Sequence, residues 1–428
     1  MKHLRRMVLL IVAATFSMAS ICIFGVDVVQ PANASVAAQA VRPVGLGADS
    51  DNCDRATVKQ ELMKLRAQQD RRGIVCTEPA ALSKEATDRK TRKFRAAMAD
   101  GPNGTVEPPE FCTSTPDGRW KFQRKIACLY EHRQGRLWQL DGEVLVLVGT
   151  WQYVRSDMYS VSQTIRTEFA YQQQISVSAP TGEARAGLTL VGGFSCIGWC
   201  AYGPSQYPLQ QVGDGSTLLG GSRTFSSTAL TVGDLGTVDI SIKWTWGKSG
   251  YTNSDNFSTS PSLRCDHRLP GNTAAGCVFA QHTPVLVFDE SVTAYSEQTR
   301  HIRDAQASGL PGAPDSNLPL RRETNPDKRR ANFETTCPQA YTRPTGHQCD
   351  EYPFQSTKQG GATQPPGTGR THDWCSIPQL PTGVSNAAGW SSCMITTSHN
   401  RQGGIHIRNF YNSERVLEDD PFYVKVEP

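Results

Sequence analysis

Two short polar segments near the C-terminal end of the chain carry residue types suited to acid–base and metal chemistry. The first is Cys-Asp-Glu-Tyr-Pro-Phe at residues 349–354, preceded by His347. Either carboxylate, Asp350 or Glu351, could take a proton from water. On a strand the two would point to opposite faces, so only one would enter a site while the other supported it or faced solvent. An acidic surface turn is the structural alternative.

The second segment is His-Asn-Arg-Gln-Gly-Gly at residues 399–404, ahead of an expected helix over residues 404–414. Asn400 stands where a helix N-cap would. Its amide oxygen would also suit a hard cation, and Arg401 beside it could hold a phosphate. The pattern therefore predicts a capped helix start, a metal and phosphate site, or both.

Several packed units are needed to position these segments. The chain has 428 residues, of which 38% are hydrophobic and 20% charged, and its formal net charge is +4. This composition excludes a coiled coil, a collagen-like chain and broad disorder. The small net charge neither requires nor excludes a polyanionic partner. We predict a multidomain α+β protein.

The N-terminus has the pattern of a secretory signal. Lys2, Arg5 and Arg6 precede an uncharged, mostly apolar run over residues 7–26, and small-residue cleavage sites end at Ala34 and Ala40. We predict a signal peptide over residues 1–40, an extracellular protein, and no stable membrane anchoring after cleavage. An uncleaved anchor is the alternative, and the two cleavage sites argue against it.

The cysteines also indicate an oxidising compartment. Of the 13 cysteines only Cys22 lies in the expected leader, which leaves an even number for disulfides. A zinc site at Cys196 and Cys200 is disfavoured because no second close pair follows. Pairing of sequence neighbours is expected, although sequence alone leaves the connectivity open. The expected pairs are Cys53–Cys76, Cys112–Cys128, Cys196–Cys200, Cys265–Cys277, Cys337–Cys349 and Cys375–Cys393.

Periodicity divides the exported part into regions. Residues 41–135 are expected to form a helical, basic region with helices over 54–72 and 83–98, and the basic cluster of the second is interpreted as a solvated face. Alternating apolar residues over 161–177 and 238–246, with apolar runs at 144–148 and 285–288, predict an antiparallel β sandwich or barrel. This β domain is assigned residues 136–309, including a helix over 296–307. A linker over 310–330 and a small disulfide-stapled α+β domain over 331–428 follow.

Several spaced motifs in the last region resemble the bacterial NucA/NucB deoxyribonuclease domain. They are Asp-Glu-Tyr-Pro at 350–353, Gly360-Gly361, Asn-Arg-Gln-Gly-Gly at 400–404 and a closing strand over 422–426. That family belongs to the ββα-metal non-specific endonucleases, so the resemblance implies two strands and a helix flanking one divalent cation. The upstream sheet also resembles the region that accompanies this domain in secreted actinobacterial proteins.

The resemblance implies roles for individual residues. Asp350 would be the general base in the hydrolysis of DNA phosphodiester bonds, with Glu351 as the alternative base. Asn400 would bind Mg²⁺ or Mn²⁺, and Arg401 or His347 would assist at the phosphate. DNA would be bound through its backbone, without sequence preference.

Some positions depart from the family pattern. Gln359 stands where a glutamate commonly precedes the Gly-Gly pair, and the long gap before Asn400 predicts an extra loop tied by Cys375 and Cys393. Asn409 matches a family asparagine, but on a helix it would be half a turn out of phase with Asn400. Gln359, His399 and Asn409 are therefore treated as supporting candidates only.

Two other hypotheses remain open. The chain could be a catalytically inactive extracellular binding protein whose β domain grips a wall or matrix polymer, and Gln359 is the best support for this alternative. Residues 41–135 could also be a pro-segment that masks a nuclease until proteolysis.

Overall fold

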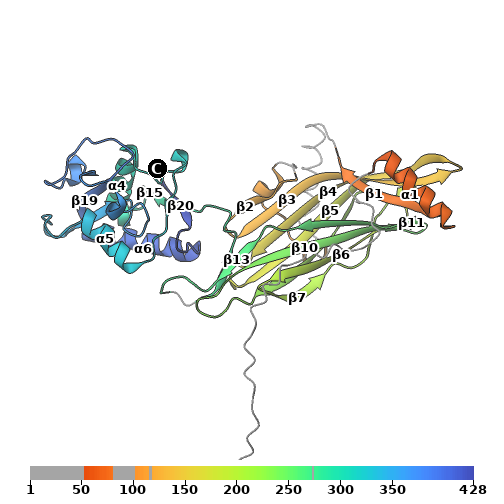
Figure 1. Cartoon of the computed structure of the whole chain (residues 1–428), viewed down its shortest axis with the longest axis horizontal. Helices are drawn as coiled ribbons and strands as arrows, with labels where there is room; N and C mark the ends of the chain where they lie inside the picture. The colour runs from red at the N-terminus through yellow and green to blue at the C-terminus, as the bar shows by residue number, and fades with distance from the viewer. Residues whose placement is uncertain (1–52, 81–101, 115–117, 272–273) are drawn as a thin grey trace, which may run out of the picture. The chain divides into compact units, whose positions relative to one another are not determined.

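The computed structural model describes residues 53–80, 102–114, 118–271 and 274–428 (Figure 1). The expected leader over residues 1–40 and the expected helix over 83–98 lie outside these ranges. Within the ranges, no helix is both long enough and apolar enough to cross a bilayer.

The first described element is helix α1 (Arg55–Ala67). Asp54 caps it, since its carboxylate accepts a hydrogen bond of 3.0 Å from the backbone N–H of Thr57. The helix is shorter than the range 54–72 expected from its apolar positions, and the chain turns into strand β1 (Gly73–Pro79). A one-turn helix, α3 (Glu110–Thr113), precedes the long strands of the sheet.

The β domain consists of two sheets packed on one shared core, in orange to green in Figure 1. The first has the order β11-β1-β3-β4-β5-β9-β7, with β2 also paired to β3. Its strands besides β1 are β2 (Lys121–Gln123), β3 (Ile126–Asp141), β4 (Val144–Val161), β5 (Glu168–Gly182), β7 (Cys200–Gln206), β9 (Thr217–Ser227) and β11 (Tyr251–Thr252).

The second sheet has the order β14-β13-β10-β6-β8, with β12 also paired to β10. Its strands are β6 (Leu188–Gly198), β8 (Gln210–Gln211), β10 (Leu235–Lys248), β12 (Ser254–Thr259), β13 (Leu263–Asp266) and β14 (Gly276–Val278). The architecture is the sandwich among the expected alternatives, because both sheets contribute to one core. Trp151 of β4 and Trp246 of β10, for example, have ring centroids 5.4 Å apart.

The alternating pattern predicted β10 well and β5 poorly. Trp244 and Trp246, expected in the core from their place in the alternation, are both buried. The single strand expected over 161–177 is wrong, because β4 ends at Val161 and β5 starts at Glu168. The hydroxyl of Ser162 accepts hydrogen bonds from the backbone N–H groups of Thr164 and Ile165, which fixes a turn there.

The expected start of the β domain at residue 136 is also too late. Strand β1 pairs with β3 from Ile74↔Trp138 to Pro79↔Arg133, and β3 itself begins at Ile126. Strand β1 and the first part of β3 lie within the region expected to be helical. That region therefore supplies part of the first sheet, because its short apolar runs find partners far along the chain.

The C-terminal domain, in green-cyan to blue in Figure 1, contains two small sheets and three longer helices in the described residues. One sheet has the order β15-β20-β16 and the other β17-β19-β18. The elements are β15 (Val285–Asp289), α4 (Ser296–Ala307), β16 (Leu320–Arg321), α5 (Pro326–Thr336), β17 (His347–Tyr352), β18 (Gly369–Arg370), β19 (Trp390–Thr396), α6 (Thr397–Ser413) and β20 (Pro421–Glu427).

This domain begins earlier than residue 331. Strand β15 pairs in parallel with β20, and Leu286 and Phe288 share a core with Ile302 of α4 and Phe422 of β20. The segment assigned to a linker, 310–330, contributes buried Leu320 and strand β16 to the same core. Assigning α4 to the β domain was wrong, because the apolar face of α4 is buried among C-terminal elements.

The described cysteines are paired with their sequence neighbours. The disulfides are Cys53–Cys76, Cys112–Cys128, Cys196–Cys200, Cys265–Cys277, Cys337–Cys349 and Cys375–Cys393. Cys337–Cys349 joins the C-terminal end of α5 to β17, and Cys375–Cys393 joins the long loop before β19 to that strand. The first disulfide therefore braces β17, which carries the first polar segment, and the second braces its partner strand β19.

Candidate active site

Strands β17 and β19 and helix α6 form a compact ββα unit. The strands are antiparallel, with Asp350 opposite Cys393, and β17 is at the edge of its sheet. Helix α6 starts directly after β19, at Thr397. The first polar segment thus lies on an edge strand and the second in the first turns of the neighbouring helix.

Asn400 is inside helix α6 and is not its N-cap. The cap position belongs to Thr396, whose backbone N–H and hydroxyl both donate to the carboxylate of Glu297 on α4, at 2.5 and 2.9 Å. The expected start of the helix at residue 404 is too late, because α6 begins at Thr397. The helical position of Asn400 puts Asn409 out of phase with it, as the nine-residue spacing predicted.

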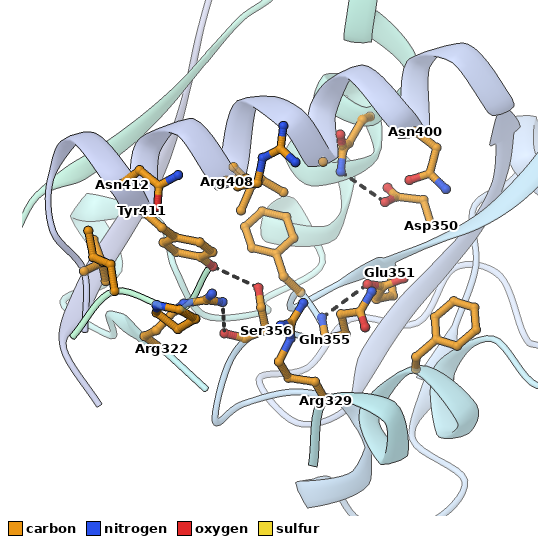
Figure 2. Close-up of a pocket in the computed structure, with 18 of the residues that line it drawn as sticks. Arg322, Arg329, Asp350, Glu351, Gln355, Ser356, Asn400, Arg408, Tyr411 and Asn412 are labelled. Carbon is orange, nitrogen blue, oxygen red and sulfur yellow. Dashed lines mark hydrogen bonds between the residues drawn. The ribbon is translucent and has the colours of Figure 1, made fainter. Parts of the chain in front are cut away.

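A pocket of about 360 Å³ opens between β17, α5 and α6. Figure 2 shows Asp350 and Asn400 at one end of it, with Arg322 beside Tyr411 and Ser356 at the other. Its polar lining includes Gln298, Arg322, Arg329, Asp350, Glu351, Gln355, Ser356, Asn400, Arg408, Tyr411 and Asn412. The two polar segments of the sequence therefore meet in one pocket.

Asp350 is held by two residues of helix α4. Its Oδ2 atom lies 2.7 Å from Nδ1 of His301, and its Oδ1 accepts a hydrogen bond of 3.1 Å from Nε2 of Gln298. Asp350 is only 3% exposed, and both partners are buried. The carboxylate is thus fixed in orientation, while each of its oxygens keeps a lone pair for a further donor.

A chain of hydrogen bonds continues from His301 away from the pocket. Nε2 of His301 is 2.8 Å from the Ser391 hydroxyl, which is 3.2 Å from Nε2 of His372. Burial and the neighbouring His301 lower the pKa of His372, which favours its neutral form. One tautomer set satisfies every link: His372 donates to Ser391, Ser391 donates to His301, and Nδ1–H of His301 donates to Asp350.

Glu351 occupies a different environment from its neighbour. Strand alternation turns it toward α5, away from His301, and its Oε1 accepts a hydrogen bond of 3.2 Å from the backbone N–H of Gln355. Burial, and secondarily the charge of Asp350, raise the pKa of Glu351 to about 8. Both side chains still reach the pocket because β17 is an edge strand, so the expectation that only one would enter is wrong.

The residues at the Asp350 end of the pocket fit a hard divalent cation. Nδ2 of Asn400 contacts Oε1 of Gln348 and the carbonyl of Cys349, at 3.3 and 3.4 Å, and its Oδ1 has no donor among the described residues. No group of three or more His, Cys, Asp or Glu side chains in the described ranges forms a ready-made metal site. Mg²⁺ commonly binds to few protein oxygens and completes its coordination shell with water and substrate phosphate. One amide oxygen near carboxylates fits this pattern.

Five of the candidate residues lie outside the pocket lining. His347 is exposed at the start of β17, and Arg401 and Asn409 are exposed on α6. His399 lies 3.6 Å from the carboxylate of Glu297. Oε1 of Gln359 accepts a hydrogen bond of 2.9 Å from the backbone N–H of Arg321, which ties its loop to β16.

The Gly-Gly pair that follows Gln359 has a packing role. A Cβ on Gly360 would lie 2.2 Å from the Asn332 side chain, and one on Gly361 would lie 2.3 Å from Thr336. Asn332 of α5 in turn donates to the carbonyls of Gln355 and Thr357. The motif thus allows the loop after β17 to lie close against α5, which places Gln355 at the pocket.

Gln298 and His301 are the site residues that sequence reasoning missed. They stand three positions apart on the buried face of α4, next to Thr299, Ile302 and Ala305. A glutamine and a histidine on a helix face that is otherwise apolar or small need polar partners. That signal was present, but α4 had been assigned to the other domain.

Strand β17 and helix α6, which carry the two polar segments, and strand β19 between them in the sequence lie within one continuous part of the chain. Residues 313–425 match the family model described as Deoxyribonuclease NucA/NucB, and this part of the chain is a NucA/NucB deoxyribonuclease domain. The resemblance inferred from the motifs is therefore confirmed. The matched segment contains Asp350, Glu351 and Asn400 but not Gln298 and His301.

Two other comparisons add little. A search of curated proteins finds no significant match to the chain. Among solved structures, the GAE domain of GGA2p from Saccharomyces cerevisiae is similar at 8% identity over 29% of this chain and 95% of that chain, with a TM-score of 0.16. A likeness at that level carries no argument about fold or function.

Proposed function

We propose that the protein is a secreted, metal-dependent, non-specific endodeoxyribonuclease whose catalytic unit is the C-terminal domain from β15 to β20. The observation that supports this most strongly is the joint position of Asp350 and Asn400 at one end of the pocket, with Asp350 held by His301. The family match supplies the substrate class, DNA.

In the proposed reaction, Asp350 accepts a proton from a water molecule while the oxygen of that water forms a bond to the phosphorus atom. The bond from phosphorus to the 3′ oxygen breaks, and that oxygen leaves with the electron pair. A divalent cation, Mg²⁺ or Mn²⁺, bound through Oδ1 of Asn400, would offset the negative charge that develops at the phosphate. His301 and Gln298 keep the Asp350 carboxylate aimed into the pocket.

The geometry favours Asp350 over Glu351 as the base. Asp350 is oriented by two donors and shares its end of the pocket with Asn400, whereas Glu351 lies toward Gln355 (Figure 2). The raised pKa of Glu351, about 8, leaves it mostly protonated at neutral pH, and a protonated carboxyl cannot accept a further proton.

The disulfides support export of the protein. Pairs such as Cys337–Cys349 persist in oxidising compartments and are rare in the cytosol. Together with the signal pattern at residues 1–40, they support an extracellular protein.

The inactive binding protein is the less favoured alternative. Its main support is that Gln359 stands where the family commonly has a charged glutamate. Gln359 lies outside the pocket lining, however, and its side-chain oxygen accepts a hydrogen bond from the backbone N–H of Arg321. A glutamine there does not remove a group from the proposed site.

The experiment that tests the proposal is digestion of plasmid DNA by the purified exported chain. We expect nicking and linearisation with Mg²⁺ or Mn²⁺ and intact DNA with excess EDTA, with activity restored by adding back the ion. A folded protein that leaves DNA intact with either ion would refute the proposal and favour the binding protein.

A further inference from the structure

The pocket that contains Asp350 and Asn400 is also lined by arginines. Arg322 precedes α5, Arg329 lies on α5 and Arg408 lies on α6, and all three line the pocket. Figure 2 shows Arg322 next to Tyr411 and Ser356, and Arg329 near Gln355. The pocket therefore holds arginines as well as its two carboxylates, with Arg322 at the end opposite Asp350 and Asn400.

These arginines have no acidic partners within ion-pair distance in the described part of the chain, unlike the neighbouring cations. Lys328 reaches Glu323 at 4.0 Å, and Arg330 pairs with Asp327 at 2.8 Å. Arg329 lies between them in the sequence, yet its guanidinium faces the pocket (Figure 2). Arg329 has no carboxylate within ion-pair distance in the described residues, although its positive charge acts at longer range on Glu351.

Arg322 and Arg329 also repel each other. Burial, and to a smaller extent the positive charge of Arg329, lower the pKa of Arg322. The Nε atoms of both arginines are buried and have no hydrogen-bond acceptor in the described residues. Arg322 is held by the carbonyl of Ser356 at 3.3 Å and by the ring of Tyr411, 3.7 Å from its guanidinium carbon.

Two like charges with unsatisfied donors cost free energy unless an anion compensates them. A phosphate suits this arrangement, because the planar guanidinium fork matches phosphate oxygens and binds them in charge-assisted hydrogen bonds. The carboxylates nearest the pocket, Asp350 and Glu351, already have donors of their own.

We propose that Arg322 and Arg329, with Arg408 at the rim, form a second phosphate subsite that binds a backbone phosphate next to the one being cut. This inference rests on the proposed function, since it assumes that a DNA strand occupies the pocket. The subsite contacts phosphate and no base edge, so it would orient the strand without selecting a sequence. It would place the scissile phosphate at the Asp350 end.

The test measures binding rather than cleavage, in the full exported chain carrying Asp350→Asn so that DNA stays intact. The affinity for a labelled single-stranded oligonucleotide is followed by fluorescence anisotropy as NaCl is raised from about 50 to about 300 mM. Arg329→Gln is compared with Arg330→Gln. Arg330 is the matched control, since it is the next residue of α5, 66% exposed, and paired with Asp327.

We expect Arg329→Gln to weaken binding about tenfold and to reduce the slope of log K against log salt by about 0.7, the value for one lost phosphate contact on a single strand. Arg330→Gln should leave the slope unchanged and alter the affinity less than about twofold. Arg329→Lys should keep the slope but recover only part of the affinity, because it retains charge and loses the fork.

Equal changes in affinity and salt slope for Arg329→Gln and Arg330→Gln would overturn the proposed subsite. If Arg329→Gln lowers the melting temperature, Arg408→Gln is used instead, because the Arg408 side chain is exposed and its replacement should not disturb folding. An unchanged salt slope for Arg408→Gln would then overturn the proposal. Failure of the proposed function would appear separately, as absence of cleavage by the unsubstituted protein. Failure of the subsite leaves that cleavage intact.

Discussion

Nδ1 of His301 lies 2.7 Å from Oδ2 of Asp350, and this contact joins a helix outside the family-matched segment to the proposed base. Because His301 is fully buried and also bonded to Ser391, its ring has little freedom to turn. The proposed catalytic unit therefore includes α4, which the sequence motifs alone do not reveal.

Replacing His301 should impair turnover more than binding. We expect His301→Ala to lower kcat about 10- to 100-fold with little change in KM, because Asp350 loses a donor that fixes its orientation. An unchanged kcat with only a lower melting temperature would make His301 a structural residue. Steady-state kinetics on DNA and thermal melts check this.

Two adjacent glycines of α6 offer a matched pair. A Cβ on Gly403 would lie 1.2 Å from Oε1 of Gln298, whereas one on Gly404 would meet nothing within 4 Å. Gly403→Ala should displace Gln298 from Asp350 and reduce cleavage about tenfold or more. Gly404 lines the pocket, but its added methyl group would meet open space, so Gly404→Ala should keep most of the activity and raise stability by up to about 1 kcal/mol. Equal activity of the two variants would contradict the proposed role of Gln298, and cleavage assays with thermal melts distinguish these outcomes.

Glu351 should make stability depend on pH. Its pKa is about 8 in the folded protein and near 4.5 in the unfolded chain. Its stabilising contribution is therefore present below pH 4.5 and is lost as pH rises through 8. Glu351→Gln, which mimics the protonated group, should be more stable than the unsubstituted protein at pH 8 by about 1 to 3 kcal/mol and equally stable at pH 4.5.

Chemical denaturation at the two pH values measures this difference. The same variant also tests the choice of base, because Glu351→Gln should keep cleaving DNA if Asp350 is the base. If Glu351→Gln is inactive and Asp350→Asn is active, Glu351 is the general base and Asp350 is not.

The boundary of the catalytic unit can be tested with fragments. Residues 283–428 retain β15 and α4, and we expect this fragment to fold and to cut DNA. Residues 310–428 lack Leu286, Phe288 and Ile302 of the shared core, as well as His301, and should be unfolded or inactive. Full activity of the shorter fragment would show that α4 is dispensable. Circular dichroism and plasmid digestion compare the two.

The local features of the fold were predictable where a short pattern determines them. Asp54 capping α1, the alternation that buries Trp244 and Trp246, and helix α4 with its end at Ser308 all follow from nearby residues. The predicted and observed closing strands also coincide within β20. Such features depend on interactions between residues close in sequence, which periodicity and capping rules describe.

Long-range pairing was the part that sequence could not supply. The apolar run at 285–288 was read as a strand of the β domain, but its partner is β20, which begins at Pro421. With that pairing missed, α4 was assigned to the wrong domain, and Gln298 and His301 escaped notice. Motifs carry Asp350, Glu351 and Asn400, and all three line the pocket, whereas His347 and Arg401, expected to assist at the phosphate, lie outside its lining.

The most direct test of the central claim is the rate of plasmid cleavage by Asp350→Asn beside the unsubstituted protein, with Mg²⁺ or Mn²⁺ and with matched melting temperatures. Asparagine keeps the size of the side chain but cannot take a proton from water. The account predicts that turnover falls by about two to four orders of magnitude while the fold is retained. Cleavage by Asp350→Asn at the rate of the unsubstituted protein would contradict it.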